Sequence, residues 1–251
     1  MMNDGLAGRT ALVTGGGRGI GRAICRRLAT SGVRIAINYV NDAQAAEAVR
    51  QEIEQEGGAA CTVQADVSRP EQMSAAIAAT EAALGPIDLL VCNAGIARRD
   101  DPMNPSYEHW RQVMAVNLDG VFLPVMAVKD GMIARGDGRI VCVASIAGLR
   151  PRARNVAYAT SKAAVIAFVR NIAGVIAPQV RINAVAPGLI DTEMITTMDP
   201  GLRQRLIDET PIRRLGRPEE IAEMAWFLLS DHSSFTTGQT VVASGGRVII
   251  P

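Results

Sequence analysis

The stretch Arg9-Thr-Ala-Leu-Val-Thr-Gly-Gly-Gly-Arg-Gly-Ile-Gly-Arg-Ala-Ile-Cys-Arg-Arg-Leu-Ala29 decides the fold of this chain. A short apolar run at 9–13 leads into a glycine-rich turn at 14–21, and apolar residues then recur at helical spacing up to Ala29. This order predicts a buried strand, a tight turn and a helix. The rest of the chain continues the alternation of strands and helices.

Six further apolar runs predict strands at 33–38, 59–64, 87–92, 139–144, 180–186 and 239–242. The segments between them predict helices at 43–56, 70–84, 106–135, 158–177 and 218–229, whereas 189–216 is less regular. Each strand is apolar throughout, which is typical of a parallel sheet covered by helices on both faces. The sequence therefore predicts an α/β fold with a doubly wound sheet, whose ligands bind beyond the carboxyl ends of the strands.

The composition indicates one domain spanning residues 1–251. Of the 251 residues, 48% are hydrophobic and 20% are charged, and no shift in composition marks a second domain. A net charge of +1 gives no strong field that would attract nucleic acid or an anionic membrane. Residues 1–9 lack the features of a signal peptide, and no run of 18 apolar residues is present. We expect a cytoplasmic protein without nucleic-acid or membrane partners.

The cysteines give no sign of a disulfide framework or a metal site. They lie far apart within the apolar runs, without a CxxC pair or a metal-ligand spacing, at Cys25, Cys61, Cys92 and Cys142. We interpret them as reduced core residues.

The glycine-rich turn predicts a site for a phosphate-bearing cofactor. Such a ligand needs backbone N–H groups at a helix N-terminus with no Cβ in the way, which Gly15, Gly19 and Gly21 would supply. The spacing is TGxxxGxG, which differs from the GxGxxG of longer dinucleotide-binding domains. The alternative is that the glycines only make a tight connection between strand and helix.

The end of the second predicted strand favours NADP(H) over NAD(H). An acidic residue there would accept a hydrogen bond from the ribose 2′-OH of NAD, but the sequence reads Asn38-Tyr39-Val40. The next carboxylate, Asp42, is more simply the N-cap of the following helix. Arg18 in the glycine turn can pair with a 2′-phosphate through its planar guanidinium. The alternative is that Arg18 is a solvated charge and that Asn38 tolerates either cofactor.

A second stretch, from Ser145 to Lys162, carries the candidate chemistry. Tyr158 and Lys162 are four residues apart, so in a helix they project from one face about 5–6 Å apart at Cβ. A phenol beside a cation is a candidate acid. Ser145 ends an apolar strand, where an α/β sheet presents side chains to a ligand.

Taken together, these motifs resemble the short-chain dehydrogenase/reductase family over nearly the whole length of the chain. The set, in chain order, is 14–21, Asn93-Ala94-Gly95, Asn117, Ser145, Tyr158-x-x-x-Lys162 and Pro187-Gly188. The resemblance implies a single Rossmann-type domain with seven parallel strands. It also implies an enzyme that reduces a carbonyl, or oxidises an alcohol, with NAD(P).

The resemblance assigns catalytic roles to Asn117, Ser145, Tyr158 and Lys162. Tyr158 would protonate the carbonyl oxygen, and Ser145 would hold that oxygen in place. Lowering the phenol pKa from about 10 to about 7 requires roughly 4 kcal/mol, for which Lys162 and the oxidised nicotinamide are the available cations. Lys162 would also bind the nicotinamide ribose, and Asn117 would hold a water that links Lys162 to solvent. Alternatively, Asn117 is a core amide satisfied by backbone groups.

The resemblance also extends the set of cofactor residues. Besides Tyr158 and Lys162, the expected set is Gly15, Arg18, Gly19, Ile20, Gly21, Asn38, Asp66, Val67, Asn93, Ala94, Gly95, Pro187, Gly188, Ile190 and Thr192. Asp66-Val67 would contact the adenine, 93–95 the adenosine ribose, and Thr192 the nicotinamide carboxamide. Both 66–67 and 93–95 are equally explained as turn formers.

The segment 189–216 matches the family's mobile substrate lid. Its apolar residues suit an acyl chain or a small hydrophobic ketone, and they are Leu189, Ile190, Met194, Ile195 and Met198. The overall sequence, including residues 211–220, is most similar to 3-oxoacyl-[acyl-carrier-protein] reductases. Loop arginines near the expected mouth would attract an acidic carrier or an anionic substrate, or are simply solvated, and they are Arg98, Arg99, Arg150, Arg152 and Arg154.

Several positions depart from the carrier-protein pattern. Gly136 and Gln179 stand where docking cations are expected, Ser244 replaces a typical Asp, and 171–180 is one residue shorter than usual. A carrier-linked 3-oxoacyl reductase is the first expectation, and a dehydrogenase of a free sugar, polyol or other small ketone is the alternative. A non-catalytic nucleotide-binding member is a distant third, because such a protein would lack part of the catalytic set.

The helical segment 163–177 predicts a homo-oligomer. It is apolar nearly all round, broken only by Arg170 and Asn171, which one domain does not easily cover. In the family this helix and the preceding long helix form one interface, and the C-terminal segment, here 248–250, forms a second, which gives a tetramer. Burial within the same chain is the alternative.

Overall fold

The seven predicted strands form one parallel sheet, which confirms the expected fold class. The computed structural model describes residues 4–97, 101, 103–104, 106–196 and 198–249. The strand order is β3-β2-β1-β4-β5-β6-β7, and every neighbouring pair is parallel. The strands are β1 Thr10–Val13, β2 Arg34–Tyr39, β3 Ala60–Gln64, β4 Leu89–Cys92, β5 Gly138–Val143, β6 Val180–Pro187 and β7 Thr240–Ala243.

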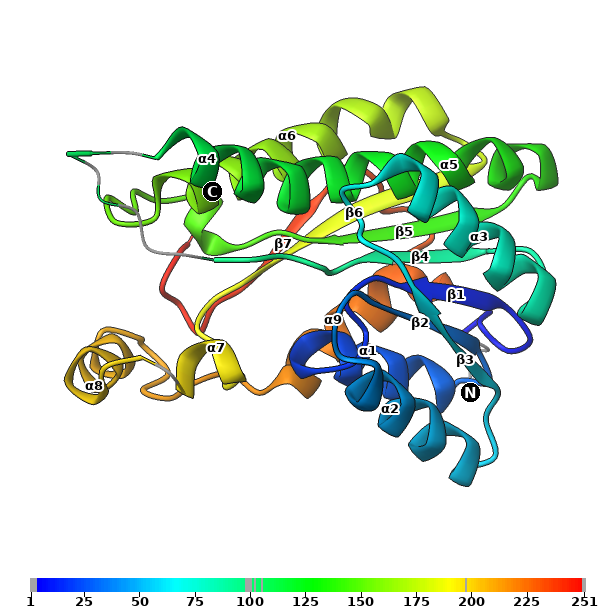
Figure 1. Ribbon diagram of the computed structural model, residues 1–251, viewed down its shortest axis with the longest axis horizontal. Coiled ribbons are helices and arrows are strands. Elements are labelled where there is room, and N and C mark those ends of the chain that lie inside the picture. The colour runs from blue at the N-terminus through cyan, green and yellow to red at the C-terminus, as the bar shows by residue number, and fades with distance from the viewer. Residues whose placement is uncertain (1–3, 98–100, 102, 105, 197, 250–251) are drawn as a thin grey trace.

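Helices cover both faces of this sheet (Figure 1). The longer ones are α1 Gly19–Ala29, α2 Ala43–Gln55, α3 Pro70–Leu84, α4 Tyr107–Met114, α5 Gly120–Arg135, α6 Val156–Ile176, α8 Pro200–Asp208 and α9 Pro218–Leu229. A short helix, α7 Glu193–Thr196, precedes α8. Buried residues of α1, α2 and α9 pack on one face, and those of α3, α5 and α6 pack on the other.

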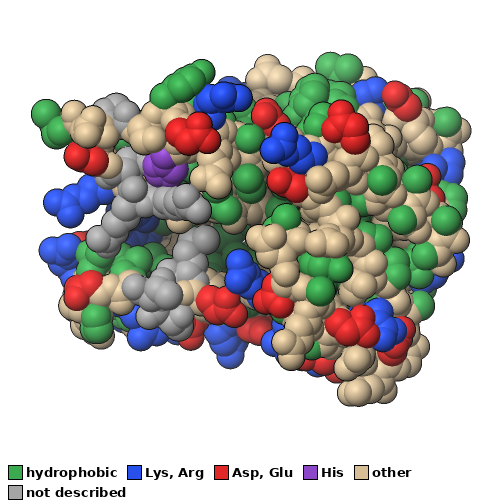
Figure 2. Space-filling view, in the orientation of Figure 1, with side chains coloured by type: hydrophobic (Ala, Val, Ile, Leu, Met, Phe, Trp, Pro, Cys, Tyr) green, Lys and Arg blue, Asp and Glu red, His purple; other side chains and the backbone are tan. Residues whose placement is uncertain are grey.

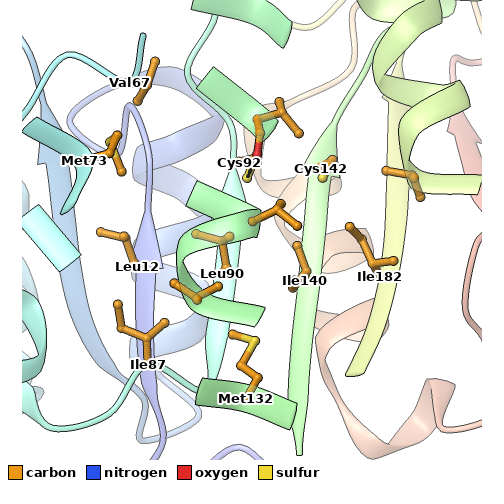
Figure 3. Packing of buried hydrophobic residues seen from close by; sticks show 14 of the residues in the cluster. Leu12, Val67, Met73, Ile87, Leu90, Cys92, Met132, Ile140, Cys142 and Ile182 are labelled. Carbon is orange, nitrogen blue, oxygen red and sulfur yellow. Dashed lines mark hydrogen bonds between the residues drawn. The ribbon is translucent and has the colours of Figure 1, made fainter. Parts of the chain in front are cut away.

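The alternation of side chains along each strand produces these two cores. Leu12, Leu90 and Ile140 point into the cluster beneath α3, α5 and α6, where Figure 3 shows them with Met132. Their sequence neighbours, such as Leu89, point into the opposite cluster. Strands buried on both faces need apolar residues at every position, which explains why the strands are apolar throughout.

Local signals fix several helix ends. The Asp42 carboxylate accepts a hydrogen bond from Ala45 N at 2.9 Å, so Asp42 is the N-cap of α2 as expected. Pro70 and Pro218 stand in the first turns of α3 and α9, where the missing N–H costs nothing. These two helices have the bounds that the sequence predicts.

The long helix expected at 106–135 is not uniform. A π-helical turn, Ala115–Asp119, separates α4 from α5 and contains Asn117. Such turns widen a helix locally and are common at functional sites. The segment 189–216, expected to be irregular, contains α7 and α8.

Two helical stretches, Tyr107–Arg135 and Val156–Ile176, are long and apolar enough to cross a membrane by composition. Both contribute buried residues to the core cluster beneath α3, α5 and α6. We therefore interpret them as core helices that pack on the sheet.

Candidate active site

Ser145 and Tyr158 meet at the carboxyl edge of β5. Ser145 follows this strand and begins a 3₁₀ turn, Ile146–Gly148, in which its Oγ accepts a hydrogen bond from Ala147 N at 3.1 Å. Tyr158 lies in the first turn of α6, and a side-chain hydrogen bond joins it to Ser145. The two predicted residues are thus brought together by the loop that leads from β5 to α6.

The pKa of Tyr158 is set mainly by burial. Burial raises the pKa of the phenol, and the Ser145 hydrogen bond and the positive charge of Arg152 only partly oppose this effect. Lys162 is not among the groups that lower this pKa, and the lowering expected with the oxidised nicotinamide stays a prediction. The reason lies in the direction of the lysine side chain, which does not bond to the phenol.

Lys162 is buried beneath the site, with 4% of its surface exposed. Its Nζ donates a hydrogen bond to the Val143 carbonyl at 2.7 Å and lies 5.9 Å from the centroid of the Tyr158 ring. Burial lowers the Lys162 pKa to about 8, a penalty of roughly 3 kcal/mol against the ammonium. A buried lysine with so perturbed a pKa, next to a phenol in a loop region, indicates a functional site.

Asn117 is satisfied entirely by protein groups. Its Oδ1 accepts from Ile96 N at 2.8 Å, and its Nδ2 donates to Ile96 O at 2.9 Å and to Ser161 Oγ at 3.0 Å. These contacts match the alternative of a core amide. A Cβ added at Gly95 would lie 3.3 Å from Asn117 Oδ1 and 3.4 Å from Lys162 Nζ, so both polar atoms lie close beneath Gly95. The water-holding role of Asn117 stays a prediction.

The glycine turn has the shape that a phosphate needs. Gly15 and Gly19 adopt positive φ angles of 62° and 51°, and a Cβ at Gly21 would lie 2.2 Å from the Gly15 carbonyl oxygen. The turn opens α1, whose first N–H groups, including that of Ile20, have no acceptor within the helix. Backbone N–H groups at a helix N-terminus fit the pyrophosphate of a dinucleotide.

Asn38 has a different role from the one expected. It is buried, with 2% exposure, and its Oδ1 accepts from Gly15 N at 3.3 Å. Its Nδ2 donates to the carbonyls of Val63 and Ala65. The side chain therefore braces the glycine turn against β3 and does not face a ribose.

Arg18 joins the glycine turn to the segment after β6. Its Nη1 lies 3.3 Å from Glu193 Oε2 on α7, and both side chains are exposed. A Cβ at Gly19 would lie 3.3 Å from the methyl carbon of Thr192, so this segment also touches the turn directly. The predicted cofactor residues Arg18 and Thr192 therefore both lie where the segment after β6 meets the glycine turn.

The remaining predicted residues lie along the same edge, mostly as braces. Asp66 accepts from Ser68 N at 2.9 Å in a local turn and lines a hollow of about 490 Å³ beyond β2 and β3. Val67 is buried in the core against Gly120. The turn-forming alternative thus describes the side chain of Asp66, whereas that of Val67 belongs to the core, and the adenine contact of both stays a prediction.

The segment after β4 is also tied to the glycine turn. Asn93 Nδ2 donates to the carbonyls of Thr14 and Gly15. The Thr14 hydroxyl accepts from the N–H groups of Asn93 and Ala94 at 2.9 and 3.1 Å. This bracing role of Thr14 was not predicted, although the residue directly precedes the glycines of the turn.

At the end of β6, the chain passes close to the segment after β7. Gly188 follows Pro187, and a Cβ at Gly188 would lie 2.7 Å from Ser244 Cα. Ile190 is buried in the core, so only its backbone is placed toward the cofactor edge. Among the earlier candidates, Arg98 and Arg99 and the side chain of Met194 lie outside the described residues.

Two further functional candidates escaped the sequence analysis. Ser161, next to Lys162, accepts from Asn117 and donates to the Tyr158 carbonyl at 2.8 Å, so it links three candidate residues. Arg247 is buried and forms an ion pair with Glu209 of the segment 189–216 at 3.0 Å. Its position near the C-terminus, far from any motif, gave no signal.

The fold and this arrangement of side chains define a class of protein. The family model described as enoyl-(acyl carrier protein) reductase matches residues 15–247. The chain belongs to the short-chain dehydrogenase/reductase family, whose members use NAD(P)(H) to interconvert alcohols and ketones.

Similar proteins act on different substrates. Acetoacetyl-CoA reductase of Rhizobium meliloti is 41% identical, over 95% of this chain and 98% of the relative. A 3-oxoacyl-[acyl-carrier-protein] reductase of Synechocystis is 38% identical (97% and 98%), and galactitol 2-dehydrogenase (L-tagatose-forming) of Cereibacter sphaeroides is 42% identical (97% and 96%). A solved structure described as a candidate gluconate dehydrogenase from Agrobacterium tumefaciens superposes with a TM-score of 0.95 at 31% identity, covering 100% of both chains.

Proposed function

We propose that this chain interconverts a ketone and a secondary alcohol with NADP(H), with Tyr158 as the acid and base. The observation that carries the proposal is the hydrogen-bonded pair of Ser145 and Tyr158 above the buried Lys162. A bound dinucleotide supplies or accepts the hydride. The glycine turn, with its free N–H groups and its positive φ angles, fits the pyrophosphate of this cofactor.

The chain's own residues handle the proton. Ser145 donates a hydrogen bond to the carbonyl oxygen, and Tyr158 delivers its proton to the same oxygen as negative charge develops there. In the reverse direction the phenolate accepts the proton from the alcohol. The Lys162 ammonium stabilises the phenolate electrostatically, and Asn117 and Ser161 fix the first turns of α6 around it.

The choice of NADP(H) rests on Arg18. The described end of β2 presents Val40 and no carboxylate, and Arg18 is exposed at the edge of the glycine turn. An exchange of Glu193 for a 2′-phosphate would give Arg18 a partner with more charge and more acceptor oxygens.

For the substrate, we place a free small ketone or polyol first. Arg152 lies close enough to Tyr158 to influence its ionisation, which suits a polar substrate better than an acyl chain. Gly136 and Gln179 also leave the carrier-docking positions without charge. The galactitol dehydrogenase relative, at 42% identity, supports the same class.

A 3-oxoacyl thioester is the second candidate. The apolar residues of the segment 189–216, including the buried Ile190 and Ile195, favour it. The acetoacetyl-CoA and 3-oxoacyl reductase relatives act on this class. If the segment closes over the site as a lid, these apolar groups would line it.

A panel of substrates tests the proposal. Oxidation of NADPH and of NADH is followed with L-tagatose, acetoacetyl-CoA and a carrier-linked 3-oxoacyl thioester, and galactitol is tested with NADP⁺. We expect turnover with NADPH and at least one ketone, and none with Tyr158→Phe. Turnover that survives in Tyr158→Phe, or a higher kcat/KM with NADH, would contradict the proposed mechanism or cofactor.

We further propose a cytoplasmic homotetramer. The edge strand β7 and the residues after it line a hollow of about 600 Å³, and Phe235 and Ile249 are strongly exposed nearby in the chain. Val175 on α6 is also exposed, as expected for a helix covered by a second copy. Light scattering that shows a stable monomer would refute the tetramer.

A further inference from the structure

Arg152 occupies the loop that joins the two halves of the catalytic pair. This loop runs from the turn after Ser145 to the start of α6, which carries Tyr158. The Arg152 carbonyl accepts a hydrogen bond from Asn155 N at 2.9 Å, so a local turn holds the residue in position. The side chain is half-buried, unlike that of Arg154, which is exposed on the same loop.

The guanidinium of Arg152 lacks the partners that a half-buried cation normally has. Its Nε is shielded from solvent and has no hydrogen-bond partner. Among the residues that the structure describes, no carboxylate forms an ion pair with it. A half-buried cation without an ion-pair partner is costly, so such a group calls for an explanation.

The charges around Arg152 leave room for an anion. The groups that act on it electrostatically are Arg150, Arg247, Tyr158 and Glu209. Glu209 is the one carboxylate of this set, and it is already paired with Arg247 at 3.0 Å. Arg247 is further satisfied by the Leu206 carbonyl, to which its Nη1 donates. The charge of Arg247 is therefore compensated within the protein, whereas that of Arg152 is not.

Arg152 is the member of this cluster whose charge acts on Tyr158. Figure 2 shows the molecule hollowed between α4 and the α7–α8 segment, with Lys and Arg side chains around the opening. Residues 206–210 of the segment and Arg247 close one side of the cluster through their mutual hydrogen bonds. An anion that entered beside Tyr158 would meet Arg152, which has no ion pair with a described carboxylate.

We propose that Arg152 binds a carboxylate of the substrate, so that the preferred substrate is a small keto acid or the corresponding hydroxy acid. The inference rests on the proposed ketone chemistry at Tyr158 and names its substrate class. A planar guanidinium pairs with a carboxylate through two parallel hydrogen bonds, which would also orient the ketone toward Tyr158. A single carboxylate balances the charge of Arg152.

Matched acids and esters test the inference. The ratio of kcat/KM for acid over methyl ester is measured with NADPH for acetoacetate and levulinate, each against its methyl ester. For at least one pair we expect the wild type to prefer the acid, and Arg152→Gln to reduce that ratio by about ten- to hundredfold, the loss expected for a charge-assisted pair. Arg152→Lys keeps the positive charge but loses the two parallel donors of the guanidinium, so its acid-over-ester ratio of kcat/KM should be intermediate.

Arg154→Gln is the matched control, because this arginine is exposed on the same loop and its removal should leave the ratio unchanged. An unchanged ratio in Arg152→Gln, or a wild type that prefers both esters, would overturn the inference. A preference for dihydroxyacetone phosphate over both acids would overturn the choice of a carboxylate.

A binding measurement separates this inference from the proposed function. Levulinate is titrated calorimetrically into the protein saturated with NADPH, for the wild type and for Arg152→Gln. Binding that Arg152→Gln weakens at least tenfold supports the anion site even if no ketone is turned over, in which case only the proposed function fails. If ketones are turned over but the wild type and Arg152→Gln bind levulinate equally, the proposed function is supported and the proposed anion site at Arg152 is contradicted.

Discussion

The cofactor side and the substrate side of this site are built in different ways. Around the glycine turn, Asn38, Asn93 and Thr14 bond to backbone groups, and their polar atoms serve to hold loops in place. On the substrate side, Tyr158 and Lys162 have pKa values shifted against their charged forms, and Arg152 has no ion-pair partner among the described residues. A site made from backbone suits a cofactor that a whole family shares. A site made from side chains with shifted pKa values and an arginine without an ion pair suits a substrate that distinguishes one member.

The largest effect should come from removing the acid on the substrate side. Tyr158→Phe deletes the proton donor and should lower kcat by on the order of 10³-fold or more. NADPH affinity, measured by fluorescence titration, should change little, because the cofactor turn does not depend on the phenol. A loss of NADPH binding as large as the loss of kcat would erase the distinction between the two sides.

A substitution on the cofactor side should instead lower NADPH affinity. Gly21→Ala places a Cβ 2.2 Å from the Gly15 carbonyl and must displace the turn. We expect NADPH affinity to fall about 100-fold and the free energy of unfolding to fall by about 1–3 kcal/mol. Isothermal titration and urea unfolding measure the two quantities.

Gly174→Ala is the matched control for this variant. A Cβ at Gly174 meets nothing within 4 Å, and the residue lies within α6. The substitution should stabilise the protein by about 0.5–1 kcal/mol and leave NADPH affinity unchanged. If both glycine variants lost NADPH affinity and stability to a similar extent, the glycine turn would have no particular role in binding the cofactor.

The pH dependence should report the substrate side. Burial lowers the Lys162 pKa to about 8, so the ammonium is present below this pH and is lost above it. Burial also keeps the Tyr158 phenol protonated at neutral pH. We therefore expect kcat/KM for ketone reduction to fall by up to about tenfold per pH unit above pH 8. A profile that stays flat well beyond this pH would mean that Lys162 does not assist the reaction in its charged form.

The smallest effect should follow from Arg18. Arg18→Ala removes an exposed cation from the cofactor turn, so kcat/KM with NADPH should fall about tenfold, with little change for NADH. The Glu193→Gln variant breaks the same ion pair from the other side and should not lower the NADPH value. Equal losses with both cofactors in Arg18→Ala would argue against a 2′-phosphate contact.

Most of the fold was predictable because the signals are local. Apolar strands, Pro70, Pro218 and the Asp42 cap depend on a few neighbouring residues, and the bounds of α3 and α9 were predicted without error. The π-helical turn at 115–119 was not predicted. It contains Asn117, whose side chain bonds to Ile96 in another segment, and such a contact cannot be seen in the local sequence.

The candidate site was likewise predictable where the signals are local and unpredictable where they are not. Spacing brought Ser145, Tyr158 and Lys162 into one candidate, and the structure places them together. The burial that raises the Tyr158 pKa and the bracing role of Asn38 were not predicted, because both depend on distant parts of the chain. The pairing of Arg247 with Glu209, which leaves Arg152 uncompensated, is likewise visible only in three dimensions.

The separation of the two sides is tested most directly by one matched measurement. NADPH affinity and the single-turnover rate of ketone reduction at saturating NADPH are determined in parallel for the wild type, Tyr158→Phe and Gly21→Ala. We predict that Tyr158→Phe loses the rate and keeps the affinity, whereas Gly21→Ala loses affinity and retains most of the rate once saturated. Two variants that lose rate and affinity in equal proportion would contradict the account.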